Sequence, residues 1–396
     1  MIEEIKIANF RSFGDELALR LSPFSVFVGP NAAGKSNLID AFRFLRDCVA
    51  GGLEAAVAHR GGWPILRCKR RRQPYIHFEV AGNRLDGSAT LVMREQQRFH
   101  NPHFTYSLTF NGELTVVAES GSLSGIPEGS EEPQEISGFN RDQEVVEIRE
   151  WSEEPKKIPV GKGLRRALFV HTHFVSYASY VISDALQGLR FYDPQLQQAR
   201  QPVESQPFFE PFVSETGGNL AAVLHTLRSD NGETRERIRL LLQDMVPGFE
   251  DWRTKRLADG SIAFEVQERR MRGALPPAAV SDGTIRLLIL LIALLRPPPS
   301  STAIFLEEPE RNLHPLLLEP LVQVMREVSS QMQIIVTTHS AEFVRYCWPE
   351  EVYLMDKVEG CTRIVRADSV EHIQDFLQHW TLDELWLQGY LEGGRP

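Results

Sequence analysis

The chain has 396 residues, of which 42% are hydrophobic and 24% charged, and its formal net charge is −10. This composition is typical of globular proteins, and the length allows one large core or about two to three domains. The longest clean apolar run, Leu287–Leu295, is far shorter than the ~20 residues that span a bilayer, so no membrane partner is expected. The first residues, MIEEIKIANF, show no signal-peptide pattern. The four cysteines form no CxxC pair, which argues against a zinc site or a disulfide framework and favours a cytoplasmic protein.

The first informative element is the apolar strand Phe24–Val28, which runs into the loop GPNAAGKSN and then a helix. The loop fits the pattern GxxxxGK[ST] through Gly29, Gly34, Lys35 and Ser36. Glycines let backbone amides approach phosphate oxygens, and the start of the helix adds its positive dipole end. In this pattern the lysine reaches the β- and γ-phosphates and the hydroxyl ligates Mg²⁺. We therefore predict a binding site for ATP or GTP together with Mg²⁺.

The middle of the chain predicts a sheet followed by helices. Residues 219–246 have a helical pattern, and no heptad repeat is sustained between Ser36 and Ser281, so a long coiled coil is not expected. Short segments of alternating apolar and polar residues are typical of an antiparallel sheet with one covered face. These segments are residues 74–82, 88–95, 104–110, 113–120 and 144–151.

This pattern predicts four parts of the chain. They are an N-terminal nucleotide-core segment at 1–60, an antiparallel insertion at 61–175 with an acidic mobile loop at 123–155, a helical lobe at 176–282, and a C-terminal nucleotide-core segment at 283–396.

Charge is unevenly distributed over the insertion. Residues 128–154 hold ten acidic residues against two arginines, which accounts for eight of the ten net negative charges. The run RCKRRR can be interpreted as a solvated edge segment or as a patch that follows the phosphates of double-stranded DNA. In the second case the acidic segment would cover the patch when DNA is absent. The basic residues are Arg67, Lys69, Arg70, Arg71 and Arg72.

Three segments of the C-terminal part end or begin in polar residues. SDGT (281–284) precedes a strongly apolar helix, so free amides and a hydroxyl face outward. The apolar strand at 303–306 ends in Glu307 and Glu308, and QIIVTTHS contains a strand that ends in His339. Buried parallel strands place such residues at the carboxyl edge of a sheet. Glu307 is suited to ligate the Mg²⁺ of a nucleotide site, and Glu308 is suited to act as the base that activates water. A single histidine after a strand, in contrast, is more often structural.

Taken in this order, the motifs resemble the ABC-type ATPase heads of the SMC and RecF-like proteins. They are more closely similar to the AAA_21 group of predicted ATPases, whose head is shared with the overcoming-lysogenisation-defect nucleases. IKIANFRSF resembles the opening strand and turn of this family, and GPNAAGKSN resembles its Walker A loop. SDGT resembles the signature motif, and IFLEEPERNLHP resembles the Walker B strand followed by the D-loop. TTHS resembles the motif that carries the switch histidine. The ending LDELWLQGYLEGG also resembles the tail of that group.

The resemblance implies an α/β fold with a mostly parallel core sheet, an antiparallel β subdomain and a helical signature lobe. It implies an ATPase that uses ATP and Mg²⁺ and works as a head-to-tail homodimer or a higher oligomer, with Ser281 and Gly283 acting in trans. Ser36 and Glu307 would hold the metal, and Glu308 and His339 would be catalytic. Nucleotide contacts are implied for Arg11, Ser12, Gly29, Pro30, Asn31, Ala32, Ala33, Gly34, Lys35, Ser36, Asn37, Ser281, Asp282 and Gly283.

The sequence also departs from the family pattern. Glu307 stands where Walker B usually has aspartate, which affects the metal geometry and the turnover expected. Asp282 replaces a glycine of the transporter signature, as suits the SMC-like branch. No residue is assigned to the Q-loop; Gln187 is the first candidate and Gln73 the weaker one. No acidic cluster for a two-metal nuclease follows His339, so the nuclease domain of the related enzymes is not expected.

Two functions are compatible with these motifs. The first is an ATPase that acts on nucleic acid in genome defence or repair. The second is a slow ATP-dependent scaffold or sensor that holds and releases a separately encoded effector, such as a nuclease.

Overall fold

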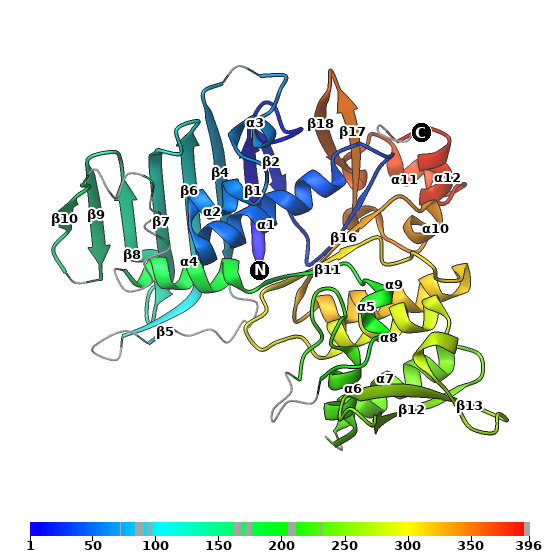
Figure 1. Cartoon of the computed structure of the whole chain (residues 1–396). Helices are drawn as coiled ribbons and strands as arrows, with labels where there is room; N and C mark the ends of the chain where they lie inside the picture. The colour runs from blue at the N-terminus through cyan, green and yellow to red at the C-terminus, as the bar shows by residue number, and fades with distance from the viewer. Residues whose placement is uncertain are drawn as a thin grey trace.

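The computed structural model describes residues 1–71, 73–83, 91–92, 97–151, 153–161, 166, 168, 170, 176–204, 211–229 and 232–391. Within these ranges the strands form sheets of nine, six and three strands. Figure 1 shows the nine-stranded sheet on the left, the six-stranded sheet in the middle and a helical lobe with the small sheet at the lower right. No helix in the described ranges is long and apolar enough to cross a membrane.

The six-stranded core sheet has the strand order β11-β15-β16-β3-β17-β18. The first five strands are parallel, and β18 pairs antiparallel with β17. β3 and β16 are buried along their whole length, as expected when both faces of a parallel sheet are covered. The predicted mostly parallel core sheet is therefore confirmed. The strands are β11 (Leu189–Tyr192), β15 (Ala303–Glu307), β16 (Gln333–Thr338), β3 (Phe24–Val28), β17 (Val352–Val358) and β18 (Cys361–Arg366).

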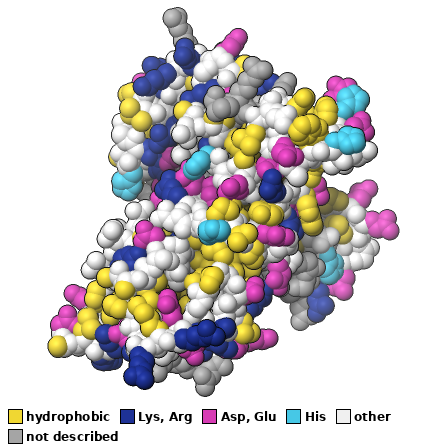
Figure 2. All heavy atoms as spheres, turned by 90° about the vertical axis from the view of Figure 1, so that its right-hand side faces the viewer, with side chains coloured by type: hydrophobic (Ala, Val, Ile, Leu, Met, Phe, Trp, Pro, Cys, Tyr) yellow, Lys and Arg dark blue, Asp and Glu magenta, His cyan; other side chains and the backbone are white. Residues whose placement is uncertain are grey.

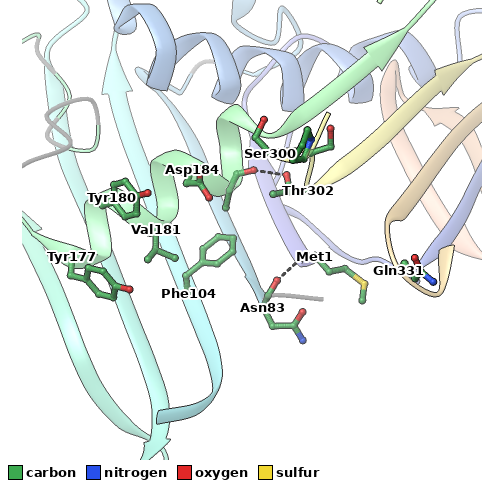
Figure 3. A pocket seen from close by; sticks show the side chains of 13 residues that line it. Met1, Asn83, Phe104, Tyr177, Tyr180, Val181, Asp184, Ser300, Thr302 and Gln331 are labelled. Atoms are coloured by element: carbon green, nitrogen blue, oxygen red, sulfur yellow. Dashed lines mark hydrogen bonds between the residues drawn. The ribbon is translucent and has the colours of Figure 1, made fainter. Parts of the chain in front are cut away.

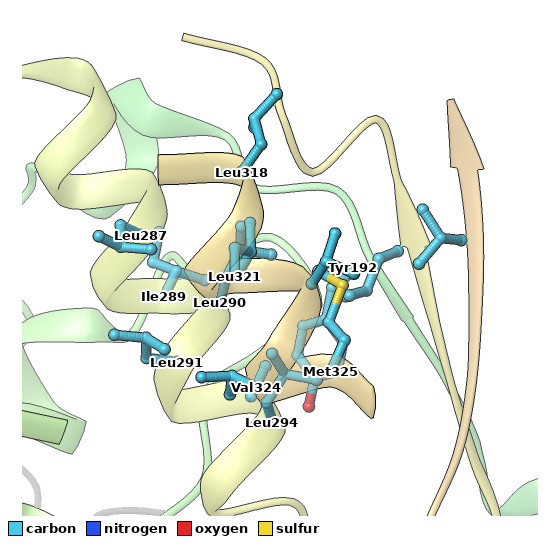
Figure 4. Packing of buried hydrophobic residues seen from close by; sticks show 14 of the residues in the cluster. Tyr192, Leu287, Ile289, Leu290, Leu291, Leu294, Leu318, Leu321, Val324 and Met325 are labelled. Carbon is cyan, nitrogen blue, oxygen red and sulfur yellow. The ribbon is translucent and has the colours of Figure 1, made fainter. Parts of the chain in front are cut away.

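Alternate residues of the core strands point to opposite faces of the sheet and join two hydrophobic cores. Phe27 and Phe305 belong to the core that α1 shares with the nine-stranded sheet. Val26 and Ile304 belong to the other core, in which leucines of α8 pack against α9 (Figure 4). α8 is buried on nearly every side, which explains why its sequence is apolar without a polar face. The helices are α1 (Lys35–Gly51), α8 (Asp282–Leu295) and α9 (Leu318–Ser329).

The nine-stranded sheet is antiparallel, with the order β10-β9-β8-β7-β6-β4-β1-β2 and β5 paired to β6. Inward and outward residues alternate regularly along β4 and β6, and α4 covers β7 and β8. The predicted antiparallel subdomain is confirmed. The elements are β1 (Ile2–Ala8), β2 (Leu17–Arg20), β4 (Tyr75–Asn83), β5 (Leu91–Val92), β6 (Arg98–Asn111), β7 (Val116–Pro127), β8 (Gln134–Arg141), β9 (Val145–Glu150), β10 (Lys156–Pro159), α2 (Leu53–Ala58), α3 (Trp63–Leu66) and α4 (Tyr177–Gln187).

Two expectations for this sheet need correction. β1 and β2 lie in the segment 1–60 but pair with β4 in the antiparallel sheet, so the sheet is not built from an insertion alone. The acidic mobile loop expected at 123–155 is wrong for most of its length, because β8 pairs with β7 and β9 there. Proline, glycine and glutamate suggested a loop, but the neighbouring strands supply the hydrogen bonds that a loop would lack.

The remaining lobe is not purely helical. α6 and α7 occupy most of the predicted helical stretch, and they pack against a three-stranded antiparallel sheet in the order β12-β13-β14. No described helix exceeds the 17 residues of α1, so the described part of the chain contains no long coiled coil. The elements of this lobe are α6 (Leu220–Ser229), α7 (Glu233–Met245), β12 (Phe249–Arg256), β13 (Ile262–Glu268) and β14 (Ala274–Leu275). The remaining short elements of the described chain are α5 (Leu196–Ala199), α10 (Ala341–Val344), α11 (Ile373–Phe376) and α12 (Leu382–Leu387), with 3-10 turns at Pro277–Ala279, Pro315–Leu317, Pro349–Glu351 and Ala367–Ser369.

Candidate nucleotide-binding site

The strand register brings the sequence motifs together at the carboxyl edge of the core sheet. Thr337 of β16 is paired with Glu307 of β15, and Thr338 is paired with Val28 of β3. The residues that follow these three strands therefore emerge side by side, where open α/β sheets bind their ligands. They are the glycine-rich loop, the pair of glutamates and His339.

The shape of the glycine-rich loop depends on the β17–β18 hairpin. A Cβ on Gly29 would lie 2.3 Å from the carbonyl oxygen of Met355, and a Cβ on Gly34 would lie 2.2 Å from Thr362 Oγ1. Gly34 also has a φ of +113°, which side chains rarely adopt. Both glycines are thus required by the fold around the loop, and the cradle they leave fits phosphate groups approached by backbone amides.

Lys35 begins α1 and lies across the loop. Its Nζ donates hydrogen bonds to the carbonyl oxygens of Gly29 (2.6 Å) and Pro30 (3.0 Å). Burial lowers the pKa of Lys35, and the carboxylates of Glu308 and Glu310 oppose that shift. A buried ammonium bonded mainly to neutral carbonyls is under-compensated, so the lysine is poised to bind an anion.

The other residues of the loop region divide into exposed and supporting groups. Asn31, Ala32 and Ser36 are exposed, as contacts to a ligand require. Ser12 is buried beneath the loop, where its hydroxyl accepts a hydrogen bond from Asn37 Nδ2 (2.7 Å). A further buried hydroxyl, from Thr362, lies 2.7 Å from Ser12 Oγ and donates to the carbonyl oxygen of Ala33 (2.8 Å). Ser12, Asn37 and Ala33 therefore support the loop's conformation.

Arg11 is held beside α1. Its Nε donates to Asp40 Oδ2 (2.6 Å), and Arg60 binds the other oxygen of the same carboxylate (2.8 Å). The guanidinium is therefore engaged with the helix that follows the loop.

Glu307 lies in a partly buried cluster at the end of β15. Burial raises the pKa of Glu307, and Arg43 of α1, at 3.2 Å, opposes that shift. Asp193 raises it further. Neither Arg43 nor Asp193 was assigned from sequence. Asp193 carried a readable signal, because it follows the apolar segment LRFY and precedes proline, as expected at a strand end.

Glu308 adopts a φ of +46° and is held by an arginine and a histidine. Its Oε1 lies 3.1 Å from His339 Nδ1, and Oε2 lies 2.5 Å from Arg311 Nη2. Burial would raise the pKa of Glu308, but Arg311 and His339 outweigh it and hold the pKa below the usual value. Glu308 is therefore a carboxylate that stays ionised, beside the residue predicted to be the switch histidine.

The signature residues pack against the D-loop of their own chain. Ser281 is exposed and caps α8 by accepting a hydrogen bond from the amide of Thr284 (3.1 Å). Asp282 binds Arg200 and Asn312 Nδ2. A Cβ on Gly283 would lie 2.6 Å from the carbonyl oxygen of Asn312, so a glycine is required here.

Neither candidate for the Q-loop lies beside Glu307 in the core sheet. Gln187 ends α4 and precedes β11, which places it at the amino edge, and its amide donates to Ser183. Gln73 precedes β4 of the nine-stranded sheet, and its carbonyl accepts from Asn9. At the carboxyl end of β11 the residue is Asp193.

The amino edge of the core sheet has a hollow of its own. A cavity of about 200 Å³ lies between α4 and the segment 299–302 (Figure 3). Tyr177, Tyr180 and Asp184 line it from one face of α4, and Phe104 lies opposite. This cavity is separate from the carboxyl edge and contains none of the predicted site residues.

Comparison with known proteins gives two family matches on this chain. The model described as “AAA domain, putative AbiEii toxin, Type IV TA system” matches residues 184–345, and the model “AAA ATPase domain” matches residues 1–49. Together they cover the glycine-rich loop, the signature, both glutamates and His339, and they leave out the nine-stranded sheet beyond β2.

Two curated proteins match short parts of the chain. One is “Chromosome partition protein Smc” of Synechococcus sp., 48% identical over 44 residues, which is 11% of this chain and 4% of that protein. The other is “OLD nuclease” of Thermus scotoductus, 34% identical over 80 residues, which is 20% of this chain and 12% of that protein. The match thus spans a small fraction of either relative.

Solved structures match over nearly the whole chain. An Smc head bound to the C-winged helix domain of ScpA aligns with a TM-score of 0.53 at 14% identity, covering 92% of this chain and 97% of that one. An Smc head from Pyrococcus furiosus, bound to the C-terminal domain of ScpA, aligns with a TM-score of 0.50 at 11% identity, covering 95% and 99%. At this identity they show the shared fold. Fold, family models and motifs agree, and together they support a P-loop ATPase of the SMC/RecF-like group.

Proposed function

We propose that this protein binds ATP with Mg²⁺ and hydrolyses it to ADP and phosphate in order to switch a head-to-tail dimer. The observation that carries the proposal is the combination at one sheet edge of an under-compensated lysine and an ionised glutamate held by a histidine. These are the groups that phosphoryl transfer to water needs, namely a cation for phosphate and a base for water.

Binding would use the loop Gly29–Asn37. Its amides would face the phosphates, and Lys35 would exchange its carbonyl contacts for phosphate oxygens, which compensate a buried ammonium better. The Ser36 hydroxyl and Glu307 would hold Mg²⁺, with Asp193 beside Glu307 as an additional oxygen donor. When bound, the metal would neutralise phosphate charge during hydrolysis.

Hydrolysis would use Glu308 as the general base. Because its pKa is held low, Glu308 is ionised at neutral pH and free to accept a proton from water. Nδ1 of His339 orients one carboxylate oxygen, which leaves Nε2 to face the substrate. Ser281 and Asp282 are exposed at the start of α8, so a second head could meet them. We infer that they complete the partner's site, in a dimer or a higher oligomer.

For the biological role we favour nucleic-acid-linked genome defence or repair in the cytoplasm. The partial matches to an Smc protein and to an OLD nuclease support this role, and the free thiols of all four cysteines fit the location. Three residues of the basic run, Arg67, Lys69 and Arg70, are exposed, whereas Arg71 pairs with Asp15; Arg72 lies outside the described residues. The acidic strands β8 and β9 lie at the far end of the nine-stranded sheet from β1, so the proposed covering of the basic run by them is abandoned (Figure 1).

The alternative is an ATP-dependent scaffold that holds a separately encoded effector. It is favoured by the Smc heads of similar fold, which were solved with a bound protein partner. Figure 2 adds that on one face of the molecule acidic and basic side chains are interspersed among hydrophobic ones, which suits a protein partner better than a phosphate backbone.

The trap variant Glu308→Gln tests the ATPase switch. It should bind ATP like the wild type, hydrolyse it about a hundredfold or more slowly, and elute as a dimer when ATP and Mg²⁺ are present. Glu79→Gln, in the nine-stranded sheet, is the matched control and should behave as wild type. A Glu308→Gln protein that stays monomeric and hydrolyses ATP normally would show that Glu308 is not the base.

Subunit mixing tests the head-to-tail arrangement. Ser281→Arg should retain ATP binding and lose hydrolysis, and mixing it with Lys35→Ala should restore at most one complete site per heterodimer. Ser130→Arg, at a partly exposed position between β7 and β8, is the control. Loss of ATP binding by isolated Ser281→Arg would place Ser281 in the site of its own chain.

Salt dependence separates the two biological roles. If the three exposed cations of the basic run bind duplex phosphates, log K against log salt should have a slope of about −2.7, and reversing them to glutamate should abolish binding. The absence of duplex binding, together with co-purification of a stable protein partner under ATP-locked conditions, would favour the scaffold.

A further inference from the structure

Glu310 is a buried carboxyl group two residues beyond Glu308, and no motif assigned it a role. Its Oε1 accepts a hydrogen bond from Thr338 Oγ1. Its Oε2 is inaccessible to solvent and has no hydrogen-bond partner among the described residues. A buried polar atom left in this state destabilises the fold, so a glutamate kept here needs an explanation.

The partner of Glu310 lies directly before the switch histidine. Thr338 is the last residue of β16, is fully buried, and is followed by His339. Its hydroxyl gives its single hydrogen to Glu310 and accepts one from the amide of Ser340 (2.9 Å). The residues on both sides of His339 are thus joined through the Thr338 hydroxyl, which is in turn bonded to the Glu310 carboxylate.

Electrostatics place Glu310 within reach of the proposed reacting groups. Burial raises the pKa of Glu310, and the Thr338 hydrogen bond, the residue's own backbone amide and His339 oppose this shift. Glu310 also acts on the pKa of Lys35, in the same direction as Glu308. The carboxylate therefore joins the turn after β15 to the end of β16, and its charge also acts on the lysine of the glycine-rich loop.

We propose that Glu310 is a positioning residue for hydrolysis, which fixes His339 against Glu308 through Thr338. The inference rests on the proposed ATPase function and adds Glu310 and Thr338 to the residues that support hydrolysis. Glu310 touches neither substrate nor metal in this role. It sets the backbone from which His339 reaches Glu308 Oε1 at 3.1 Å. A simple loop anchor would affect stability and leave the rate of hydrolysis per folded molecule unchanged.

Paired substitutions separate these two roles. Glu310→Ala and Thr338→Val remove the hydrogen bond, whereas Glu310→Gln and Thr338→Ser keep an acceptor and a donor. We expect the first pair to lower kcat about 10- to 100-fold, because a displaced catalytic group forfeits most of its contribution. The affinity for a fluorescent ATP analogue should stay within about twofold, since the phosphate loop is untouched. The conservative pair should stay within about threefold of wild type.

Epistasis with the histidine is the decisive measurement. If Glu310 acts through His339, Glu310→Ala should add no further loss of kcat in a His339→Ala background. Wild-type kcat for both Glu310→Ala and Thr338→Val, or a full additional loss in that background, would overturn the proposal. Thermal unfolding confirms that each variant is folded, and if Glu310→Ala is not, the near-isosteric Thr338→Val carries the test alone.

A readout without turnover keeps this inference separate from the proposed function. The ring NMR signals of His339, assigned with His339→Gln, should shift in Thr338→Val and remain in place in Thr338→Ser. Signals unchanged in both variants would refute the positioning role, even if the protein proves to hydrolyse ATP. Shifted signals in a protein that hydrolyses no ATP would support the contact and refute the ATPase assignment.

Discussion

The two large sheets bury charged side chains in different ways. In the nine-stranded sheet, Glu119 is buried with Arg141 at 3.4 Å, and the hydroxyl of Tyr106 and the amide of Val170 also donate to it. At the carboxyl edge of the core sheet, Lys35 has two carbonyl acceptors and Glu310 has an oxygen without a partner. Glu119 is thus met by an arginine and two neutral donors, whereas the hydrogen-bond acceptors of Lys35 are neutral carbonyl oxygens.

Two lysines show the same difference. Lys6 of β1 is ion-paired with Glu79 at 2.7 Å, and this hydrogen bond raises the pKa of Lys6. Burial lowers the pKa of Lys35. The fold favours the charged form of Lys6 and disfavours the charged form of Lys35. Binding of an anion would therefore stabilise the charged form of Lys35.

The largest effect is expected from removing the lysine at the core edge. Lys35→Ala should weaken ATP binding about a hundredfold or more, because a desolvated charged partner of the phosphates is lost. Lys6→Ala should leave binding unchanged. Equilibrium titration with a fluorescent ATP analogue measures both. Equal ATP affinities of Lys35→Ala and Lys6→Ala would contradict the proposal that the lysine at the core edge binds the phosphates.

A smaller effect, on stability alone, is expected in the nine-stranded sheet. Arg141→Met leaves Glu119 buried without its cation and should lower the free energy of unfolding by about 3 kcal/mol. Arg149→Met breaks a more exposed pair with Glu135 and should cost less than about 1 kcal/mol. Denaturant unfolding gives both values. ATP affinity per folded molecule should be unaffected, and a loss of affinity in Arg141→Met would mean that the nine-stranded sheet takes part in the site.

The smallest effect concerns the pH dependence of hydrolysis. Arg311 and His339 hold the pKa of Glu308 down against burial. In Arg311→Ala that pKa should rise, so less of the base is ionised in mildly acidic solution and the acid limb of kcat moves to higher pH. At neutral pH the loss should stay below about tenfold. An acid limb unchanged in position would show that another group limits the rate.

Much of the site was determined locally by the sequence. Gly34, Lys35 and Ser36 follow one another where a strand passes into a helix, and this local pattern alone predicted a phosphate-binding loop. The apolar strands that end in Glu307 and Thr338 predicted a common edge, because parallel strands have a fixed direction. The AAA_21 and SMC-like resemblance and the fold class followed from these motifs and are confirmed.

Tertiary structure decided the rest. No spacing in the chain could place Arg43 beside Glu307 or Thr362 beside Ala33, because these partners lie hundreds of residues apart. The strand β8 was missed because its pairing with β7 and β9 overrides a loop-like composition. The orphan oxygen of Glu310 exists only once β16 has brought Thr338 beside it. Sequence determines what a residue can donate or accept, whereas burial and neighbours, set by long-range packing, determine whether that capacity is already used.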